Sequence, residues 1–477
     1  MVWLLIALPL LAAVLAFFID SVPVRVRLLP ATAILHLAVL VLALCGWNLL
    51  PANPWLGLDA LGGWTLLVIS VLFLFCACYA PAYLALRPDR DNRVFVTSFL
   101  AFLGLASLLA SARHPGLVWV AMETTTLATA PLIYFNHNRR SIEATWKYLI
   151  IGSVGIALAL LGTLFLAYSA HMGGLSEPLF YTSLMQGAGG LSRPWLRAGF
   201  VLALVGYGTK MGLAPLHTWK PDAYGESPGV IGALLAGGVT SCAFLALLRF
   251  YAIVAAAGEI QFARELMVAM GLLSMLWAAV FMVRQLDIRR LLAYSSVEHM
   301  GILAFGIGIG GRAARFALFH LAANALVKGV LFMAAGNINR SYASKRLPYV
   351  TGAIRRTPVS GWLFFLGFLA ITGTPPFAPF ISEFNIAATA LARPYLWTGI
   401  AFLVLLGGIF LAMSDIVVQV VFGTPPPDRV RTPYRDTLAT TAPLVLALAL
   451  SMAMGLWLPG PLGAMIRAAA ALVEGHP

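Results

Sequence analysis

The sequence has few charged residues for its length. Only 10% of its 477 residues are Asp, Glu, Lys or Arg, whereas 61% are hydrophobic. Soluble globular domains carry about 25% charged residues, so a soluble chain of this composition could not shield its apolar surface from water. The composition therefore excludes a soluble enzyme and indicates a polytopic membrane protein.

Cysteine and histidine are also scarce, with four and eight residues. Cys76 and Cys78 are separated by one residue, and Cys45 and Cys242 stand alone, so their spacing fits neither a zinc site nor a disulfide framework. The sequence also lacks a Rossmann fingerprint and a P-loop. We therefore expect no metal site and no cofactor in this chain.

Apolar runs long enough to cross a bilayer recur along the chain, each about 20 residues long. The N-terminal run has neither a basic n-region nor a small-residue cleavage site, so it predicts a first membrane helix rather than a signal peptide. Together the runs predict an all-α polytopic membrane protein with about 14 transmembrane helices, near residues 2–18, 28–48, 58–85, 94–112, 115–136, 144–170, 194–221, 228–254, 263–284, 288–310, 313–337, 359–390, 395–422 and 438–458. No loop is long enough for a soluble domain, so residues 1–477 are expected to form a single membrane domain.

The net charge of +13 indicates membrane orientation and not nucleic-acid binding, because the basic residues lie in short connections between apolar runs. The odd-numbered connections hold 18 of them: Arg25, Arg27, Arg87, Arg90, Arg93, Arg139, Arg140, Arg284, Arg289, Arg290, Arg340, Lys345, Arg346, Arg355, Arg356, Arg429, Arg431 and Arg435. The even-numbered connections and adjoining helix ends hold 8: Arg113, Arg193, Arg197, Arg249, Arg264, Arg312, Arg315 and Arg393. Since cytoplasmic loops collect Lys and Arg, both termini are predicted on the periplasmic side of a bacterial inner membrane.

Two of the predicted helices contain helix-breaking residues. Gly212 and Pro215 lie within the seventh, and Gly373, Pro375, Pro376 and Pro379 lie within the twelfth. Proline removes a backbone donor, and in lipid the freed carbonyls need partners in protein or in a wet cavity. Two broken segments five helices apart predict an internal repeat with a site near the bilayer midplane. The alternative is two proline kinks without function.

Ionisable residues inside apolar runs mark candidate functional positions, because a charge at the bilayer centre costs about 2.5–3.5 kcal/mol. The candidates are Glu123, Lys147, Lys210, Glu298, His299, His320, Lys328, Glu383 and Asp415, with Ser295 and Ser296 adding hydroxyls beside Glu298. Burial lowers the pKa of lysine side chains in general, whereas arginine stays protonated. Lysines in the apolar runs and arginines in the loops therefore predict a proton relay, with static ion pairs as the alternative. Lys147 is also close enough to a helix end to snorkel.

One predicted helix carries a polar stripe along an otherwise apolar surface. His320, Asn324 and Lys328 are spaced by four residues, which places them on one helix face over about two turns. Such a stripe suits either a proton path or hydrogen bonds to a neighbouring helix.

Three segments resemble the antiporter-like subunits of respiratory complex I, membrane-bound hydrogenases and Mrp-type cation/proton antiporters. They are TKMGLAPLHTWKPDAYGESP, LLAYSSVEHMGI and HLAANALVKGVLFMAAGNI, and the resemblance covers about residues 60–425. Within this family the sequence is most similar to component F of hydrogenase-4-type complexes, as in formate hydrogenlyase. The segment METTTLATAPLIYF and Glu298, where complex I subunits more often carry Ser, favour that placement.

The resemblance implies two inverted five-helix repeats, about residues 94–254 and 263–422, with flanking helices at 2–85 and 438–458 and with helices 7 and 12 broken. It implies protons moving along a central hydrated axis. Glu123 is expected to pair with Lys210 in the first repeat, and His320 to precede Lys328 in the second. Glu383 is expected to end the path at the twelfth helix.

Two positions depart from the family pattern. The eighth helix of the family often carries Lys or His, and here that position is matched to Ser241. Lys220 stands where the family usually has an apolar residue. The serine in the eighth helix puts the link between the two halves of the proton path in question, whereas Lys220 is expected either to face the loop or to add a cation near the entry. The secondary relay candidates are Ser241, Ser295, Glu298, His299, Lys220 and Asp415.

The main functional hypothesis is a proton-translocating subunit of a redox-driven complex, with H⁺ favoured over Na⁺. Its partners would be membrane and peripheral subunits that hold iron–sulfur clusters and, in a hydrogenase, a NiFe centre. A Mrp-like Na⁺/H⁺ antiporter subunit, a partner of an inorganic-carbon uptake protein and a non-conducting scaffold subunit are the alternatives.

Overall fold

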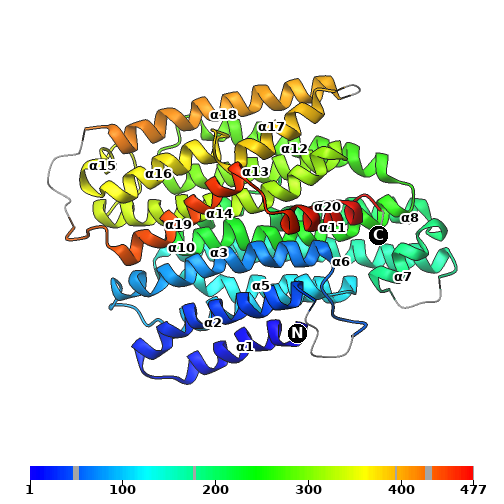
Figure 1. Ribbon diagram of the computed structural model, residues 1–477, viewed down its shortest axis with the longest axis horizontal. Coiled ribbons are helices and arrows are strands. Elements are labelled where there is room, and N and C mark those ends of the chain that lie inside the picture. The colour runs from blue at the N-terminus through cyan, green and yellow to red at the C-terminus, as the bar shows by residue number, and fades with distance from the viewer. Residues whose placement is uncertain (47–52, 176–178, 393–394, 425–431, 476–477) are drawn as a thin grey trace.

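The computed structural model describes residues 1–46, 53–175, 179–392, 395–424 and 432–475. Arg393, Arg429 and Arg431, which the sequence places in connections, lie outside these ranges. Within them the chain consists of helices joined by short connections, which confirms the all-α polytopic class (Figure 1).

The first half contains α1 (Val2–Phe18), α2 (Val22–Leu44), α3 (Ala60–Ala85), α4 (Arg93–Ser111), α5 (Pro115–Tyr134), α6 (Arg139–Met172), α7 (Tyr181–Gln186), η1 (Ala188–Gly190), α8 (Arg193–Met211), α9 (Trp219–Glu226), α10 (Gly229–Leu234), η2 (Leu235–Val239) and α11 (Thr240–Ala256). The second half contains α12 (Ile260–Met282), α13 (Ile288–Ile309), α14 (Arg312–Tyr342), α15 (Ala353–Arg356), α16 (Pro358–Ile371), α17 (Ala378–Ala390), α18 (Leu396–Phe422), α19 (Leu438–Leu456) and α20 (Gly460–Val473).

Eleven helices among the described residues are long and apolar enough to cross a membrane, counting α10, η2 and α11 as one continuous helix. The bundle has a buried centre and a lipid-type exterior. The continuous α10–α11 helix, α13 and α14 are almost wholly buried, whereas only 28–33% of the spanning windows of α2, α12 and α18 is buried. In Figure 1, α1 and α2 form one edge of the bundle and α18 forms the opposite edge, with α10, α13 and α14 between them. Leucine and valine are exposed at the edges and polar residues lie at the centre. This distribution is the reverse of that in a soluble protein, as expected when lipid is the solvent.

Both predicted helix breaks are present. α8 ends at Met211, with Gly212 in the left-handed region (φ +82°), and α9 begins only at Trp219. α16 ends at Ile371, and α17 begins at Ala378 after Gly373 (φ +71°). In each case glycine takes the positive φ that other residues avoid, and the prolines that follow cannot donate to the helical ladder.

Several helix bounds differ from the predicted ones. α2 begins six residues earlier than expected, because Arg25 is buried and donates to Asn92 (2.6 Å) at the start of α4 rather than staying in a solvated loop. Hydropathy predicts no membrane span after residue 458, yet this segment forms α20, which packs on α3, α11 and α14. Trp457–Pro459 interrupt the helix between α19 and α20, and the apolar run after this interruption is too short to be predicted as a span of its own.

Glycines allow α6 and α8 to approach each other closely. A Cβ at Gly162 would lie 2.7 Å from the carbonyl oxygen of Gly199, and a Cβ at Gly206 would lie 2.5 Å from the backbone nitrogen of Ala159. Small residues at matched positions let helix backbones meet in lipid, where dispersion contacts replace the hydrophobic effect. This contact fixes α8 and therefore the lysine at its end.

We expect Gly206→Ala to separate α6 from α8 and to lower the free energy of unfolding by about 1–3 kcal/mol, as for other overpacked interiors. Gly408→Ala is the matched control, because a Cβ there has no neighbour within 4 Å. Thermal unfolding of both variants in the same detergent checks the difference. Equal melting temperatures would show that the close approach does not stabilise the fold.

Candidate functional site

A first polar cluster surrounds Lys210 at the end of α8. The Lys210 side chain is fully buried, its Nζ donates to Thr126 Oγ1 (2.5 Å) and lies 3.8 Å from a carboxylate oxygen of Glu123. Its ammonium also lies over the Tyr148 ring, 5.3 Å from the centroid. Gly152 of α6 leaves the space into which Nζ extends. The structure thus brings together the lysine and glutamate that the family resemblance paired.

Glu123 occupies the rim of this cluster. Its carboxylate accepts a hydrogen bond from Ser153 (2.9 Å), and its side chain is 23% exposed, whereas Lys210 has no exposed surface. The Oε2 atom of Glu123 is buried but accepts no hydrogen bond within the described ranges. A buried acceptor normally has a partner, so this oxygen is placed to receive a proton or a water molecule.

The break between α8 and α9 is held by side chains instead of helical hydrogen bonds. Trp219 Nε1 donates to the carbonyl oxygen of Thr209 (2.8 Å), and the backbone nitrogen of Ala214 donates to Ser274 Oγ (2.9 Å). Gly212 contacts the stem of Lys220, which folds back across the break from α9. The break therefore lies between two buried lysines, Lys210 before it and Lys220 after it.

A second polar cluster begins at Lys220 and continues along α13 and α14. Lys220 is fully buried and donates to Ser296 Oγ (3.1 Å). The preceding residue on α13, Ser295, accepts from Lys328 Nζ (2.6 Å) and lies 3.4 Å from a carboxylate oxygen of Glu298. Two adjacent serines thus connect two lysines that are 108 residues apart in sequence.

Two histidines extend the second cluster toward α17. His299 Nδ1 lies 2.9 Å from His320 Nε2, and His320 Nδ1 lies 2.7 Å from Ser382 Oγ. Glu383, next to Ser382, is buried with its Oε1 unpartnered among the described residues. Its other oxygen contacts Gly373 in the break between α16 and α17. A cavity of about 290 Å³, lined by Glu298, Glu383 and apolar residues of α17 and α18, adjoins this end.

The same histidines form a group that could hold a metal ion. One ligand atom each from His299, His320 and Glu383 lie within 4.8 Å of one another. The sequence predicted no metal site, because these residues are far apart in the chain and lack any ligand spacing. Two hydrogen-bonded imidazoles beside a carboxylate can equally share a proton, so the geometry alone allows both chemistries.

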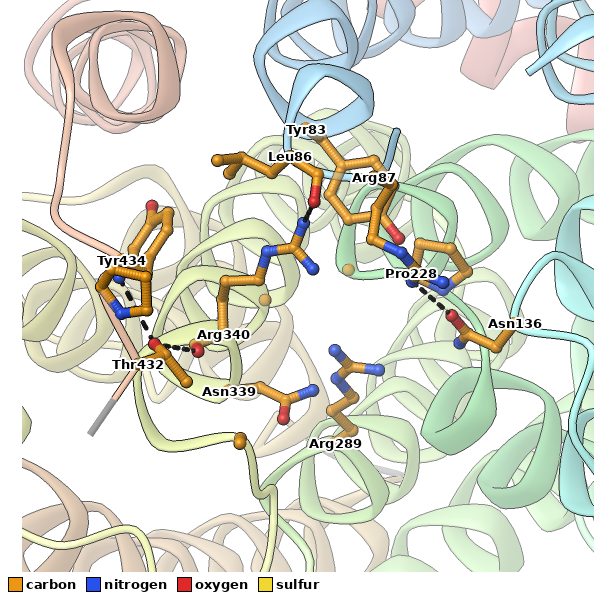
Figure 2. Close-up of a pocket in the computed structure, with 14 residues that line it drawn as sticks. Tyr83, Leu86, Arg87, Asn136, Pro228, Arg289, Asn339, Arg340, Thr432 and Tyr434 are labelled. Carbon is orange, nitrogen blue, oxygen red and sulfur yellow. Dashed lines mark hydrogen bonds between the residues drawn. The ribbon is translucent and has the colours of Figure 1, made fainter. Parts of the chain in front are cut away.

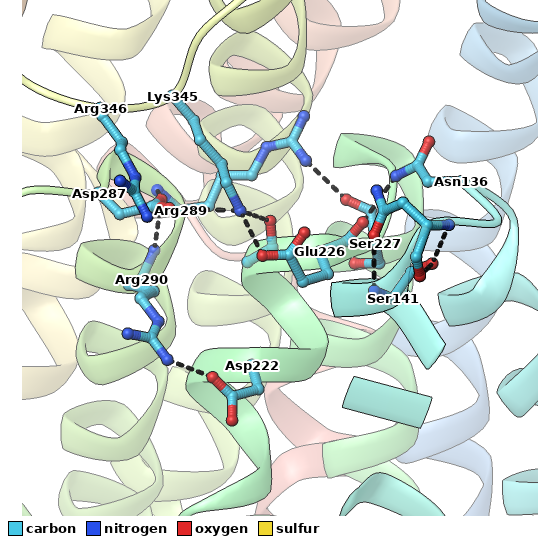
Figure 3. A network of polar contacts seen from close by, with 12 residues as sticks. Asn136, Ser141, Asp222, Glu226, Ser227, Asp287, Arg289, Arg290, Lys345 and Arg346 are labelled. Atoms are coloured by element: carbon cyan, nitrogen blue, oxygen red, sulfur yellow. Dashed lines mark hydrogen bonds and ion pairs between the residues drawn. The ribbon is translucent and has the colours of Figure 1, made fainter. Parts of the chain in front are cut away.

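A network of ion pairs covers α9 on the arginine-rich side of the bundle (Figure 3). Asp222 binds Arg290 and Lys147 (2.8 Å), and Lys345 binds Glu226 (2.9 Å) and Asp287 (3.3 Å). Asp222, Glu226 and Lys147 line a cavity of about 770 Å³ together with several other charged residues. We call this cavity the charged entrance. Lys147 therefore forms a surface ion pair and lies outside the first polar cluster.

Two of the secondary candidates lie apart from both clusters. Ser241 is buried, but its hydroxyl donates to the carbonyl of Gly237 (2.5 Å) in its own helix. Asp415 is exposed on α18 and accepts from Gln419 (3.0 Å) one turn away.

Sequence reasoning missed Thr126, Tyr148, Ser153 and Ser382, which complete the clusters. Thr126 and Ser382 lie within three residues of the acidic candidates Glu123 and Glu383, and this proximity in sequence could have marked them as members of the site. Tyr148 and Ser153 had none, because their role depends on how α5, α6 and α8 meet.

Comparison with known proteins identifies the family. The NADH:quinone oxidoreductase/Mrp antiporter transmembrane family matches residues 112–410. A hydrogenase-4 component F homolog from Methylacidiphilum infernorum is 38% identical over 374 residues, covering 77% of this chain and 76% of that protein. The chain therefore belongs to this family, and it is an antiporter-like membrane subunit of the complex I, hydrogenase and Mrp type.

Solved structures share the fold. A subunit of an archaeal membrane-bound sulfane sulfur reductase superposes with a TM-score of 0.87 at 22% identity, covering 99% of this chain and 97% of that one. A subunit of respiratory complex I from Thermus thermophilus gives a TM-score of 0.84 at 22% identity, covering 99% of this chain and 100% of that one. At these identities the likeness concerns the fold alone.

We expect Gly212→Ala to destabilise the protein in two ways. A Cβ at φ +82° is strained by about 1–2 kcal/mol, and it would also collide with the Lys220 stem. Gly258→Ala separates the two effects, because Gly258 has φ +78° and no neighbour within 4 Å. In a double-mutant cycle, Lys220→Ala should relieve part of the loss in Gly212→Ala. Additive melting-temperature changes would contradict the contact.

Proposed function

We propose that this protein is a proton-translocating membrane subunit of a redox-driven complex, of the hydrogenase-4 or complex I-like kind. The observation that carries the proposal is the pair of buried polar clusters, each built on lysine and carboxylate groups, on either side of the α8–α9 break. A static structural role needs a paired charge only, whereas these clusters also hold buried oxygen and nitrogen atoms that form no hydrogen bond among the described residues. These atoms belong to Glu123, His299 and Glu383.

The proposed topology has fourteen spans. The eleven long helices, which include α19, are joined by α1, by the broken α8–α9 pair and by the broken α16–α17 pair, and α20 follows the last span. Two inverted five-helix repeats, about residues 94–254 and 263–422, would then each contain one broken helix. Figure 1 draws both chain ends toward the same side of the bundle, which supports an even number of spans. We place that side in the periplasm of a bacterial inner membrane, because the arginine-rich connections lie opposite.

The proposed route passes from the charged entrance to the first cluster, across the break to Lys220, and along the second cluster to Glu383. Serine hydroxyls and water carry the proton where titratable groups are too far apart for a direct hydrogen bond. In this family a Lys or His of the eighth helix often connects the two halves of the path. Here the Ser241 hydroxyl at that position bonds its own helix, so Lys220, which donates to Ser296, takes over the connection. The proposed link between the halves thus lies on α9 instead of on the continuous α10–α11 helix.

The driving energy is proposed to come from partner subunits. Iron–sulfur clusters and, in a hydrogenase, a NiFe centre would lie there, and redox changes would act on this chain by altering charge near Glu123 and Lys210. Moving one charge against 100 mV costs about 2.3 kcal/mol. One ion pair formed or broken in a buried site can supply an energy of that order.

Purification of the tagged protein in mild detergent tests the assignment to a redox complex. We expect co-purifying iron–sulfur and [NiFe]-hydrogenase subunits by mass spectrometry, with bound iron and nickel by metal assay. Recovery with small membrane subunits only, and without metal, would reject the redox-driven complex in favour of a Mrp-like antiporter.

Lys210→Ala should stop proton translocation, because it removes the lysine around which the first cluster is built. We expect the protons moved per electron to fall by about a hundredfold, the lower range for loss of a proton-transfer group. Asp415→Asn is the control, since Asp415 lies on the outer surface and touches neither cluster. Acidification of inside-out vesicles, divided by the electron-transfer rate, gives the ratio. An unchanged ratio in Lys210→Ala would reject the relay.

Lys220→Met and Ser241→Ala distinguish the two ways to connect the halves. Methionine keeps most of the volume of lysine but removes the ammonium that contacts Ser296, so translocation should fall as in Lys210→Ala. Ser241→Ala removes only a hydroxyl that bonds its own helix, so translocation should stay within about twofold of the parent, which corresponds to about 0.4 kcal/mol in a barrier. The reverse pattern would place the link on α11.

A further inference from the structure

A cavity of about 510 Å³ opens at the arginine-rich end of the bundle, apart from both polar clusters (Figure 2). Its wall is built by the end of α3, the beginning of α13, the end of α14 and the junction of α9 and α10. Three arginines line it, Arg87, Arg289 and Arg340, and none of its lining residues within the described ranges is a carboxylate. We call it the arginine pocket.

Arg289 is the buried member of this group. Only 7% of Arg289 is exposed. Its Nη1 donates to the carbonyl oxygen of Ser227 (2.8 Å), its Nη2 faces the amide of Asn339, and its Nε has no partner among the described residues. Figure 2 shows the guanidinium directed into the pocket. A buried guanidinium that contacts only neutral groups keeps a full positive charge with an unused donor.

Arg340 faces Arg289 across the pocket, from the last turn of α14. One of its nitrogens donates to the carbonyl oxygen of Leu86 at the end of α3, and its guanidinium lies over the Tyr83 ring, 5.9 Å from the centroid. In the described part of the chain, neither Arg289 nor Arg340 forms an ion pair. Carbonyl and aromatic contacts orient these guanidiniums but do not neutralise them.

Three carboxylates close in sequence to lining residues are already engaged in ion pairs, one with the pocket's own Arg87 and two with Lys345. Asp89 binds Arg87 (3.0 Å), and this guanidinium holds the pKa of Asp89 below its usual range. Glu226 and Asp287 both bind Lys345. The pocket therefore presents two guanidiniums that form no ion pair among the described residues, and a third, that of Arg87, that is paired with Asp89.

We propose that the arginine pocket binds a phosphate group. Guanidinium presents parallel N–H donors that match the oxygen atoms of a phosphate, and Arg is the residue that forms such bidentate contacts. Two guanidiniums on opposite walls suit a tetrahedral anion with acceptors on several sides better than a planar carboxylate. Tyr83, Leu86, Pro228 and Tyr434 add an apolar rim.

The size of the pocket bears on the source of the phosphate. Its volume is several times that of a phosphate ion, so part of a larger molecule can enter with the anion. Basic pockets between transmembrane helices at the cytoplasmic surface are typical places for anionic lipid headgroups. A phospholipid headgroup and free inorganic phosphate share the recognised chemistry, and the experiment separates them.

The test uses the protein purified with its natural partners, because the end of the bundle is intact in that form. Wild type, Arg340→Gln and Arg289→Gln are delipidated with detergent and then incubated with phosphatidylglycerol, with phosphatidylcholine or with inorganic phosphate. Arg355→Gln is the matched control, since Arg355 is an exposed arginine outside the pocket lining. Native mass spectrometry counts bound phospholipid, and thermal unfolding measures stabilisation by each probe.

We expect wild type and Arg355→Gln to retain one more phosphatidylglycerol than Arg340→Gln, whose affinity should fall about tenfold through loss of a charge-assisted contact. Stabilisation of wild type and Arg355→Gln, but not of Arg340→Gln, by inorganic phosphate, without a difference in bound lipid, would identify free phosphate as the ligand and would also support the site. Equal lipid retention and equal phosphate response in all variants would overturn the proposal. Arg340→Gln decides the result if Arg289→Gln fails to fold, because Arg340 is not buried in the bundle.

Discussion

The cost of taking charge out of water governs this structure. Lys210, Lys220 and Lys328 are fully buried in a bundle whose exterior is made for lipid, so each ammonium must find its partners inside the protein. Each meets a hydroxyl at hydrogen-bond distance: Thr126 for Lys210, Ser296 for Lys220 and Ser295 for Lys328. The carboxylates of the clusters lie beyond these hydroxyls: Glu123 is 3.8 Å from Lys210, and Glu298 lies 3.4 Å from Ser295. Helices α5, α6, α13 and α14 are packed around these contacts, and the apolar residues outside them complete the fold.

Much of the fold could be predicted because a helix that crosses lipid needs about 20 mostly apolar residues. Apolar length predicted most of the helices, and the glycines and prolines of the two breaks predicted the interruptions at Met211 and Ile371. Prediction failed where side-chain partners override hydropathy. Arg25 is charged but buried, so α2 begins before the apolar run does, and α20 is helical because it packs on three neighbours despite the interruption at Trp457–Pro459.

The candidate site divides in a similar way. Residues whose cost in lipid is high could be found from sequence, and Glu123, Lys210, His320, Lys328 and Glu383 all lie in the two clusters. The hydroxyl partners could not be found in advance, because a serine or threonine in a membrane helix can bond its own backbone at little cost, as Ser241 does. Only the packing of helices decides which hydroxyls meet a lysine. The same limit applies to Lys220, whose position in the interior depends on how α9 folds back after the break.

The length of helix between His320 and Lys328 sets how strongly these groups feel one another. Eight residues of α-helix span about 12 Å, and two unit charges at that separation interact by about 1.4 kcal/mol at an effective dielectric constant of about 20. This energy corresponds to a roughly tenfold change in an equilibrium constant. α14 therefore acts as a rigid spacer that couples the protonation of one end to that of the other without bringing the two groups into direct contact.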